Sequence, residues 1–239
     1  MDRVGGLIGR SYRLFRYSGH PEADRVVIVI GSAFEVLDET AAWLNGHGEK
    51  VGVLHVTLYR PWDAERFRAA LPPTVKRIAV LDRTKEPGGP GEPLYLDVLT
   101  SFAEALAAVR ISSMPIIVGG RYGLSSKDFD PAMARTVFDE LKKPEPKRGF
   151  TIGITDDVSH TSLAVDASFD IEPPDVVRAL FFGLGADAPS ARTRTRRRFW
   201  PRTRTAMRRA TSSTTRRSPA LTRSRTCGSA RGRSARRIC

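Results

Sequence analysis

The sequence RVVIVI at residues 25–30 decides the fold class of this chain. Its continuously apolar and mostly β-branched character predicts a short strand that is buried on both faces, as strands of parallel sheets are. Gly31 and Ser32 follow, and the next segment is predicted to be a helix because one face carries Phe34, Leu37, Ala41 and Leu44. A buried strand that leads directly into an amphipathic helix is the first half of a βαβ unit.

The alternation of strand and helix continues through most of the chain. Further strands are predicted at KVGVLHVT (50–57), RIAVL (77–81), PIIV (115–118) and FTIGI (150–154). Further helices are predicted at residues 63–71, 94–108, 131–141 and 175–182. We therefore predict one α/β domain over residues 25–187, with a mostly parallel five-stranded sheet, helices on both faces and right-handed crossovers. Residues 1–24 are predicted to be a strap that packs on this domain.

Charge is distributed unevenly along the chain. The 239 residues have a formal net charge of +13, but residues 188–239 hold 17 Arg and no Lys, Asp or Glu. The other residues hold 22 basic and 26 acidic side chains, so this part is mildly acidic and is predicted to bind neither nucleic acid nor a membrane. Both cysteines, Cys227 and Cys239, lie in the basic segment, which excludes a disulfide framework in the domain and favours a cytoplasmic setting. No apolar run reaches the roughly 18–20 residues that span a bilayer, and the N-terminal residues do not resemble a signal peptide.

The composition of the basic segment at residues 188–239 indicates a shifted reading frame. Of its 52 residues, 48 are of types whose codons have G or C in the second position. A GC-rich gene that is translated one base out of frame produces this composition. Restoring one base after the codon for Asp187 allows the next residues to be read as GTVGANKN. We therefore expect a frameshifted segment that is disordered, because it has too few apolar residues to fold. An arginine-rich arm that binds nucleic acid is the functional alternative.

Three loops that follow predicted strands carry the candidate functional residues, because ligands of parallel sheets bind at the carboxyl ends of strands. The first loop contains Asp82, Arg83, Lys85 and Glu86, the second contains Arg121, and the third contains Asp156, Asp157 and His160. The third set has no known metal-ligand spacing, and no G-x-S-x-G motif supports a serine nucleophile. Contacts with another domain are the interpretation that we favour for all three loops.

Long motifs in these loops resemble one enzyme family. LDRTKEPG (81–88), GRYGLSSK (120–127), GFTIGITDDVSHTSL (149–163) and FFGLGAD (181–187) are similar to the second domain of pyruvate:ferredoxin (flavodoxin) oxidoreductase. The resemblance implies a fold like the C-terminal domain of transketolases. The restored text GTVGANKN looks like the start of the next domain of that family.

The resemblance also implies an activity for the full-length enzyme. Pyruvate would be oxidised to acetyl-CoA and carbon dioxide with thiamine diphosphate, magnesium and CoA, and iron–sulfur clusters would pass electrons to ferredoxin or flavodoxin. The family is expected to form homodimers. Residues 1–187 contain no cysteine and no thiamine-type motif, so we expect no cofactor and no catalytic residue in this part of the enzyme.

Two functional hypotheses follow from the resemblance. The chain is either a fragment of the oxidoreductase that serves as an inter-domain structural module, or a free-standing subunit that pairs in trans with thiamine and iron–sulfur subunits. Neighbouring reading frames distinguish the two, because a fragment requires the other domains to follow in register.

Overall fold

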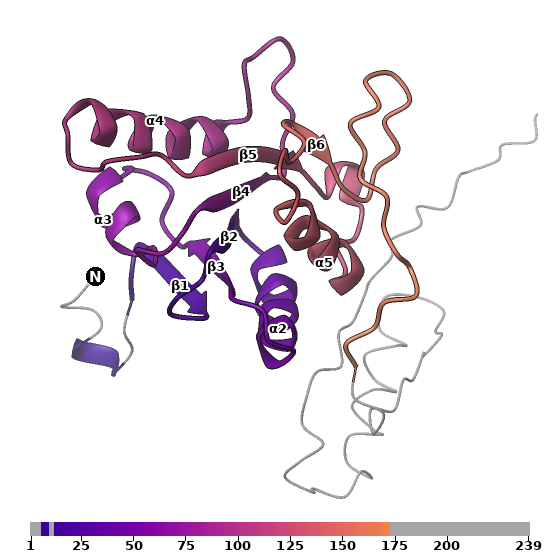
Figure 1. Cartoon of the computed structure of the whole chain (residues 1–239), viewed down its shortest axis with the longest axis horizontal. Helices are drawn as coiled ribbons and strands as arrows, with labels where there is room; N and C mark the ends of the chain where they lie inside the picture. The colour runs from indigo at the N-terminus through magenta and orange to yellow at the C-terminus, as the bar shows by residue number, and fades with distance from the viewer. Residues whose placement is uncertain (1–5, 10–11, 173–239) are drawn as a thin grey trace, which may run out of the picture. The chain divides into compact units, whose positions relative to one another are not determined.

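The computed structural model describes residues 6–9 and 12–172 of the chain. The strands are β1 Phe15–Gly19, β2 Arg25–Ile30, β3 Val51–Val56, β4 Arg77–Asp82, β5 Ile116–Arg121 and β6 Phe150–Thr151. The helices are α2 Ala33–Gly46, α3 Ala64–Ala69, α4 Pro93–Ala107 and α5 Pro131–Glu140, and a short 3-10 turn occupies Leu124–Ser126 (Figure 1). The helix predicted at 175–182 and the basic segment lie outside the described residues.

The strands form a single sheet in the order β1-β3-β2-β4-β5-β6. Strands β2 to β6 are parallel to their neighbours, and β1 is antiparallel to β3. The prediction of a mostly parallel sheet with helices on both faces is confirmed, but the number of strands is six and not five. The additional strand, β1, comes from the segment that was predicted to be a strap. Its sequence, FRYSG, has no continuous apolar run because this edge strand buries only Phe15 fully.

The last strand is shorter than its sequence predicts. Only Phe150 and Thr151 of the FTIGI segment pair with β5, at Gly120 and Arg121. Beyond Thr151 the chain turns into a loop whose residue Ser162 returns to form a bridge with Thr151. The loop therefore covers the edge of the sheet that a longer strand would have left open.

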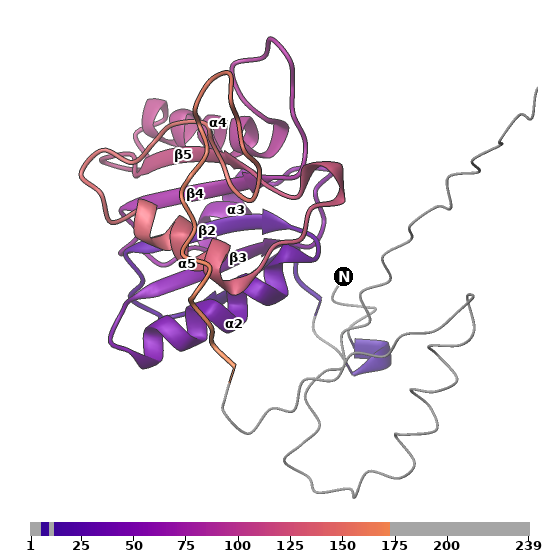
Figure 2. The same cartoon turned by 90° about the vertical axis from the view of Figure 1, so that its right-hand side faces the viewer.

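The two faces of the sheet bury separate apolar clusters. Helices α2 and α5 cover one cluster with strand residues such as Val27, Val29 and Val53. Helices α3 and α4 cover the other cluster, with Val26, Ile28 and Leu54. Successive residues of β2 alternate between the two clusters, as a strand with period two must when both of its faces are covered. Figure 1 shows α3 and α4 on one side of the sheet and α2 and α5 on the other, and Figure 2 looks onto the sheet from the side of α2 and α5.

The crossovers do not all have the same hand. The β2–α2–β3 connection moves towards the β1 edge, and β5–α5–β6 moves the opposite way, yet α2 and α5 lie on the same face. The two connections must therefore have opposite hands. The connections through α3 and α4 share the hand of the α2 connection, because both their direction and their face are reversed. The prediction that every crossover is right-handed is therefore wrong, because the α5 connection differs in hand from the other three.

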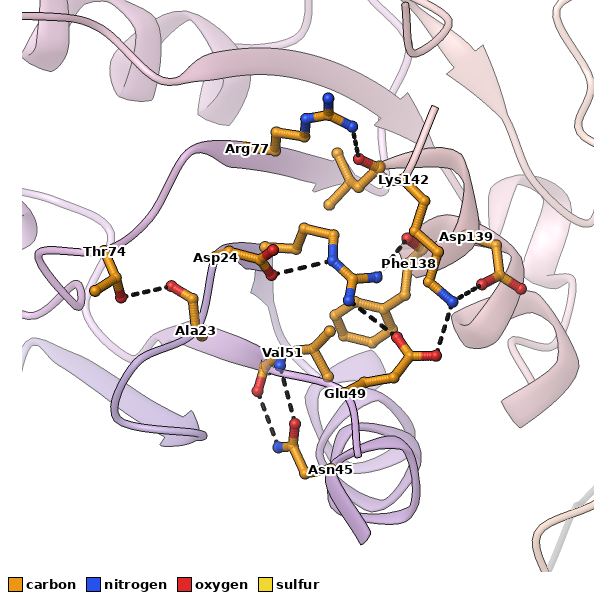
Figure 3. A network of polar contacts seen from close by, with 12 residues as sticks. Ala23, Asp24, Asn45, Glu49, Val51, Thr74, Arg77, Phe138, Asp139 and Lys142 are labelled. Carbon is orange, nitrogen blue, oxygen red and sulfur yellow. Dashed lines mark hydrogen bonds and ion pairs between the residues drawn. The ribbon is translucent and has the colours of Figure 1, made fainter. Parts of the chain in front are cut away.

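Two arginines hold the C-terminal end of α5 against the sheet. Arg25 and Arg77 are paired in register at the beginning of β2 and β4. The Arg25 guanidinium donates to the Phe138 carbonyl at 3.4 Å, and Arg77 donates to the Leu141 and Lys143 carbonyls at 2.6 and 2.7 Å. Figure 3 shows these contacts, except that with the Lys143 carbonyl. The last carbonyls of a helix have no partner within the helix, and they carry its negative dipole end, so two cations satisfy them well.

Replacing Arg25 by Ala is expected to lower the free energy of unfolding by about 2 kcal/mol. The variant loses the carbonyl contact and the 3.0 Å ion pair with Glu49, but Glu49 keeps Lys142 at 2.7 Å, so no bare carboxylate remains. Urea denaturation measures the change. Lys50→Ala is the control, since its ion pair with Glu22 is exposed to solvent and should contribute little to stability. Equal effects of the two substitutions would contradict the role given to Arg25.

Helix α4 ends in an unusual conformation. Val109 has a φ of 54°, and Arg110 donates its backbone N–H to the Ala105 carbonyl at 2.8 Å, which is the bonding pattern of a Schellman ending. Glycine usually occupies this position, because a branched side chain in the left-handed region costs about 1–2 kcal/mol. The Val109 side chain is 88% exposed, so burial does not offset that cost.

Replacing Val109 by Gly is therefore expected to raise the free energy of unfolding by about 0.5–1 kcal/mol, after the greater freedom of glycine in the unfolded chain is subtracted. Chemical denaturation of the two proteins measures this. Val158 is the matched control, because it is 84% exposed and has no positive φ. Val158→Gly should not stabilise the protein, and a stabilisation of equal size would show that strain at Val109 is not the cause.

Candidate functional site

The structure brings three of the predicted site residues together at the carboxyl edge of the sheet. Asp82 ends β4, Arg121 ends β5, and the two are paired in register. Arg83 follows directly and donates its Nε–H to the Gly123 carbonyl at 3.2 Å. The loop between β4 and α4 and the loop after β5 are therefore held together where they leave the sheet.

Asp82 connects the two ends of the β4–α4 loop. Its carboxylate accepts the backbone N–H groups of Leu94 and Tyr95, each at 3.1 Å, and so stabilises the N-terminal end of α4. The residue is only 7% exposed. Burial raises the pKa of Asp82 to about 6; the two backbone hydrogen bonds oppose this increase, and the nearby carboxylates Glu92 and Asp97 add to it.

A buried ion pair is a second interaction that fixes the end of the β4–α4 loop. Arg121 contacts the carboxylate of Glu92, whose side chain is 4% exposed and which precedes α4. Tyr122 follows Arg121 and donates its hydroxyl hydrogen to the Ile30 carbonyl of β2 at 3.1 Å. The charged groups at the base of the loop are thus engaged in holding the backbone.

The tip of the loop has the opposite character. Lys85 and Glu86 are exposed, and the described part of the chain contains no hydrogen bond or ion pair to either side chain. Gly88 has a φ of +75°, a conformation that favours glycine, and proline residues lie on both sides of it. A loop with fixed ends and an exposed charged tip is suited to contact with another surface.

The third predicted set, in the loop after β6, does not join the other two in one site. The Asp156 carboxylate accepts the backbone N–H groups of Val158 at 3.2 Å, Ser159 at 3.0 Å and Thr161 at 3.3 Å, and the Thr161 hydroxyl at 2.5 Å. These hydrogen bonds hold the pKa of Asp156 well below its ordinary value. Asp157 and His160 are exposed, and His160 takes a φ of 52° as the loop turns. Asp156 therefore shapes this loop, and its carboxylate is not directed at a ligand.

A cavity of about 380 Å³ lies beside α5 and the segment that contains Leu163 and Phe169. Its cations already have partners. Arg135 pairs with Asp139 at 3.4 Å and lies over the Phe169 ring, Lys143 pairs with Glu140 at 2.6 Å, and Lys147 donates to the His160 carbonyl at 2.8 Å. The described cations that line the cavity are therefore already held by ion pairs or hydrogen bonds within the domain.

The donor groups of the described residues do not fit the cofactors that the resemblance implies for the full-length enzyme. Iron–sulfur clusters require thiolates, and the sequence has no cysteine before Cys227. No group of three His, Cys, Asp or Glu side chains within 6–9 and 12–172 is arranged to hold a metal ion such as the magnesium of a bound diphosphate. No helix in the same residues is long and apolar enough to cross a membrane.

Sequence reasoning missed the partners of the site residues. Glu92 was not singled out, although an acidic residue directly before Pro93 stands at a favoured helix-capping position. Ser162, whose hydroxyl oxygen accepts the Asp156 N–H at 2.7 Å, was also missed. No sequence signal links Glu92 to Arg121, because 29 residues separate them.

Six strands between two helix layers, with charged loops at the carboxyl edge, define an α/β domain of the doubly covered class. Residues 23–124 match the family described as pyruvate:ferredoxin oxidoreductase core domain II. The chain is 57% identical over 187 residues to the pyruvate-flavodoxin oxidoreductase of Trichormus variabilis, and 53% identical over 187 residues to the pyruvate:ferredoxin oxidoreductase of Moorella thermoacetica. Each alignment covers 78% of this chain and 16% of the relative.

The chain is therefore homologous to the second core domain of the pyruvate:ferredoxin oxidoreductases, and the resemblance seen in its motifs is confirmed. It spans only 16% of the length of these curated relatives. A solved 2-oxoglutarate:ferredoxin oxidoreductase from Magnetococcus marinus overlaps 59% of this chain and 21% of its own, with a TM-score of 0.37 and 21% identity. That likeness is too distant to support an argument.

Proposed function

We propose that this chain is a fragment of a pyruvate:ferredoxin (flavodoxin) oxidoreductase and serves as a structural module between its other domains. The observation that carries the proposal is which charged side chains at the carboxyl edge of the sheet already have partners and which are exposed. Asp82, Arg121 and Asp156 hold loop backbones, whereas Lys85 and Glu86 are exposed at a loop tip. A loop with a fixed base and an exposed charged tip supports contact with a partner surface.

The contacts that we propose involve all three loops. Asp82, Arg83 and Arg121 hold the loop bases, Lys85 and Glu86 meet a neighbouring domain, and Asp157 and His160 extend the same surface from the loop that Asp156 shapes. The remaining domains would hold thiamine diphosphate, magnesium and the iron–sulfur clusters, bind CoA, and pass electrons to ferredoxin or flavodoxin in a cytoplasmic homodimer. The domain, predicted at residues 25–187, would begin earlier, with β1 at Phe15–Gly19, and only the residues before β1 would remain of the strap predicted at 1–24. Residues 188–239 would be a frameshifted product.

The fragment hypothesis predicts that the purified chain does not oxidise pyruvate. The assay supplies pyruvate, thiamine diphosphate, magnesium, CoA and a dye that accepts electrons, and the Trichormus variabilis relative is the positive control. No turnover by the chain is expected, because its donor groups do not fit the cofactors. Dye reduction by the chain alone, dependent on pyruvate and CoA, would refute the proposal.

The same hypothesis makes a prediction about the gene. Resequencing the locus, or inserting one base after the codon for Asp187, is expected to open a frame that begins GTVGANKN and continues through the other oxidoreductase domains. A corrected frame that meets a stop codon within a few residues, next to separate genes for thiamine and iron–sulfur subunits, would instead support a subunit that pairs in trans. A salt-dependent shift of DNA mobility caused by residues 188–239 would support a nucleic-acid arm.

A further inference from the structure

Helix α4 carries more apolar surface than the sheet covers. The described side chains that it buries fully are Leu94, Val98, Ser101, Phe102 and Ala105. At about 100° per residue, Tyr95, Leu99 and Leu106 form a neighbouring flank of the helix. Tyr95 and Leu99 are only partly buried, and Leu106 is 39% exposed. Apolar residues thus occupy more than half of the helix circumference, which is typical of a helix with neighbours on more than one side.

The other flank of α4 already has its partners within the domain. Asp97 accepts the Tyr59 hydroxyl at 2.6 Å and pairs with Arg60 at 2.8 Å. Ser101 accepts the Trp62 indole N–H at 2.8 Å, and its carbonyl accepts from Arg68 of α3 at 2.9 Å. The polar flank therefore faces α3, and the apolar flank faces away from it.

The apolar flank is directed towards a part of the sheet that no described helix covers. Tyr95 lies over Gly119 of β5, where an added Cβ would come within 3.1 Å of the ring. On this face the described helices are α3 and α4, and the strands that α4 mainly contacts are β4 and β5. Among residues 6–9 and 12–172, the helix layer on this face therefore ends at α4, before β6, and Figure 1 shows α4 as the outermost described helix on that side.

Val109 continues the apolar flank beyond the last turn of α4. It is 88% exposed and keeps a left-handed conformation that glycine would adopt at lower cost. Neither the fold of the domain nor its hydrogen bonds require a valine here. A partner that buries the side chain provides a reason for it.

We propose that the flank formed by Tyr95, Leu99, Leu106 and Val109 docks an apolar surface of another domain of the same oxidoreductase. This inference rests on the proposed function. The helix contains no Lys or Arg, which disfavours an anionic membrane or a nucleic acid as the partner. A second copy is also disfavoured. A helix of 15 residues is about 22 Å long and about 10 Å wide, so a symmetric contact would bury about 450 Å², well below the roughly 1,200 Å² of a stable interface.

The length of the relatives points to the occupant. This chain corresponds to only 16% of the Trichormus variabilis enzyme, so most of that enzyme is available to cover the flank. A domain in the same polypeptide is held at high effective concentration, so it can dock through a small apolar area that would not hold two separate chains together.

The test is a chimera in which residues 12–172 of this chain replace the matching segment of the Trichormus variabilis enzyme. Hydrogen exchange at the amides of residues 105–112 is compared between the chimera and the isolated chain. We expect exchange at least tenfold slower in the chimera, and we expect L106K and V109K to remove that protection. Both substitutions should leave the melting temperature of the isolated chain unchanged. T100K is the matched control, because it adds the same charge at an exposed position of α4 outside the flank, and it should keep the protection.

Each outcome decides the docking separately from the proposed function. Equal exchange in the chimera and in the isolated chain overturns the docking, even when the chimera oxidises pyruvate. A chimera that oxidises no pyruvate counts against the proposed function, while its exchange at residues 105–112 still decides the docking. Sedimentation is expected to show a monomeric isolated chain, and a dimer that L106K dissociates would assign the flank to a second copy and overturn the proposal.

Discussion

Replacing Arg121 by Met is expected to lower the free energy of unfolding by about 3 kcal/mol. Arg121 pairs with Glu92, whose side chain is only 4% exposed, and Asp82 lies close enough to Glu92 for the two carboxylates to repel each other. Without the guanidinium, two carboxylates remain buried with no cation at the base of the loop. Urea denaturation at neutral pH measures the loss.

A double-mutant cycle tests whether this loss comes from the unpaired charge. The variant R121M combined with Glu92→Gln removes both charges and is expected to recover at least about 1 kcal/mol relative to R121M. Arg83→Ala is the control, because Arg83 is exposed and makes a single contact with the Gly123 carbonyl at 3.2 Å, so its loss should be below about 1 kcal/mol. Strictly additive effects of the two substitutions would show that Arg121 and Glu92 are not energetically coupled, and would contradict the explanation by an unpaired buried charge.

The stability of the protein is expected to depend on pH through Asp82. Burial raises the pKa of Asp82 from 3.8 to about 6, so the folded state binds the proton more tightly than the unfolded state does. The protonated Asp82 carboxyl group therefore stabilises the folded state fully below about pH 4, and this contribution to the free energy of unfolding is lost as the pH rises through 6. This difference in pKa between the folded and the unfolded state corresponds to about 3 kcal/mol in the free energy of unfolding.

The free energy of unfolding is measured between pH 4 and pH 7 for the wild type and for Asp82→Asn. The difference between the two, wild type minus variant, should fall by about 2–3 kcal/mol as the pH rises over this range. The other carboxylates are present in both proteins, so their contributions to the pH dependence cancel in the difference. Parallel curves would show that Asp82 has an ordinary pKa, and an NMR titration of its carboxyl carbon would confirm that directly.

The sequence predicted most of the sheet because the parallel strands have a strong local signal. A strand with both faces covered is apolar at almost every position, as RVVIVI is, and the order of strands and helices follows from reading such runs along the chain. The helix beginnings after Asp63 and Asp130 were also predictable, since their carboxylates accept the N–H groups of Arg66 and Met133, three residues further on. The edge strand β1 was missed because it buries only Phe15 fully and so contains no apolar run.

Sequence reasoning also predicted which loops matter, but not the roles of their residues. The carboxyl ends of parallel strands are where ligands of such sheets bind, so the loops that carry Asp82, Arg83 and Arg121 were singled out as candidates. That Asp82 holds the beginning of α4, or that Asp156 organises its own loop, depends on where the backbone N–H groups lie after folding. A carboxylate that holds a loop backbone and a carboxylate that contacts another molecule look the same in the sequence.

The sequence alone determined the fold class, the positions of the parallel strands and the relationship to the pyruvate:ferredoxin oxidoreductases, because each depends on runs of neighbouring residues. The tertiary structure decided the Arg25 contact with α5 across 113 residues, the Arg121–Glu92 pair, the reversed hand of the α5 connection and the apolar flank of α4 that no described helix covers. The physical reason is that charge pairing and surface coverage depend on distances in space, which hydrophobic periodicity along the chain does not encode.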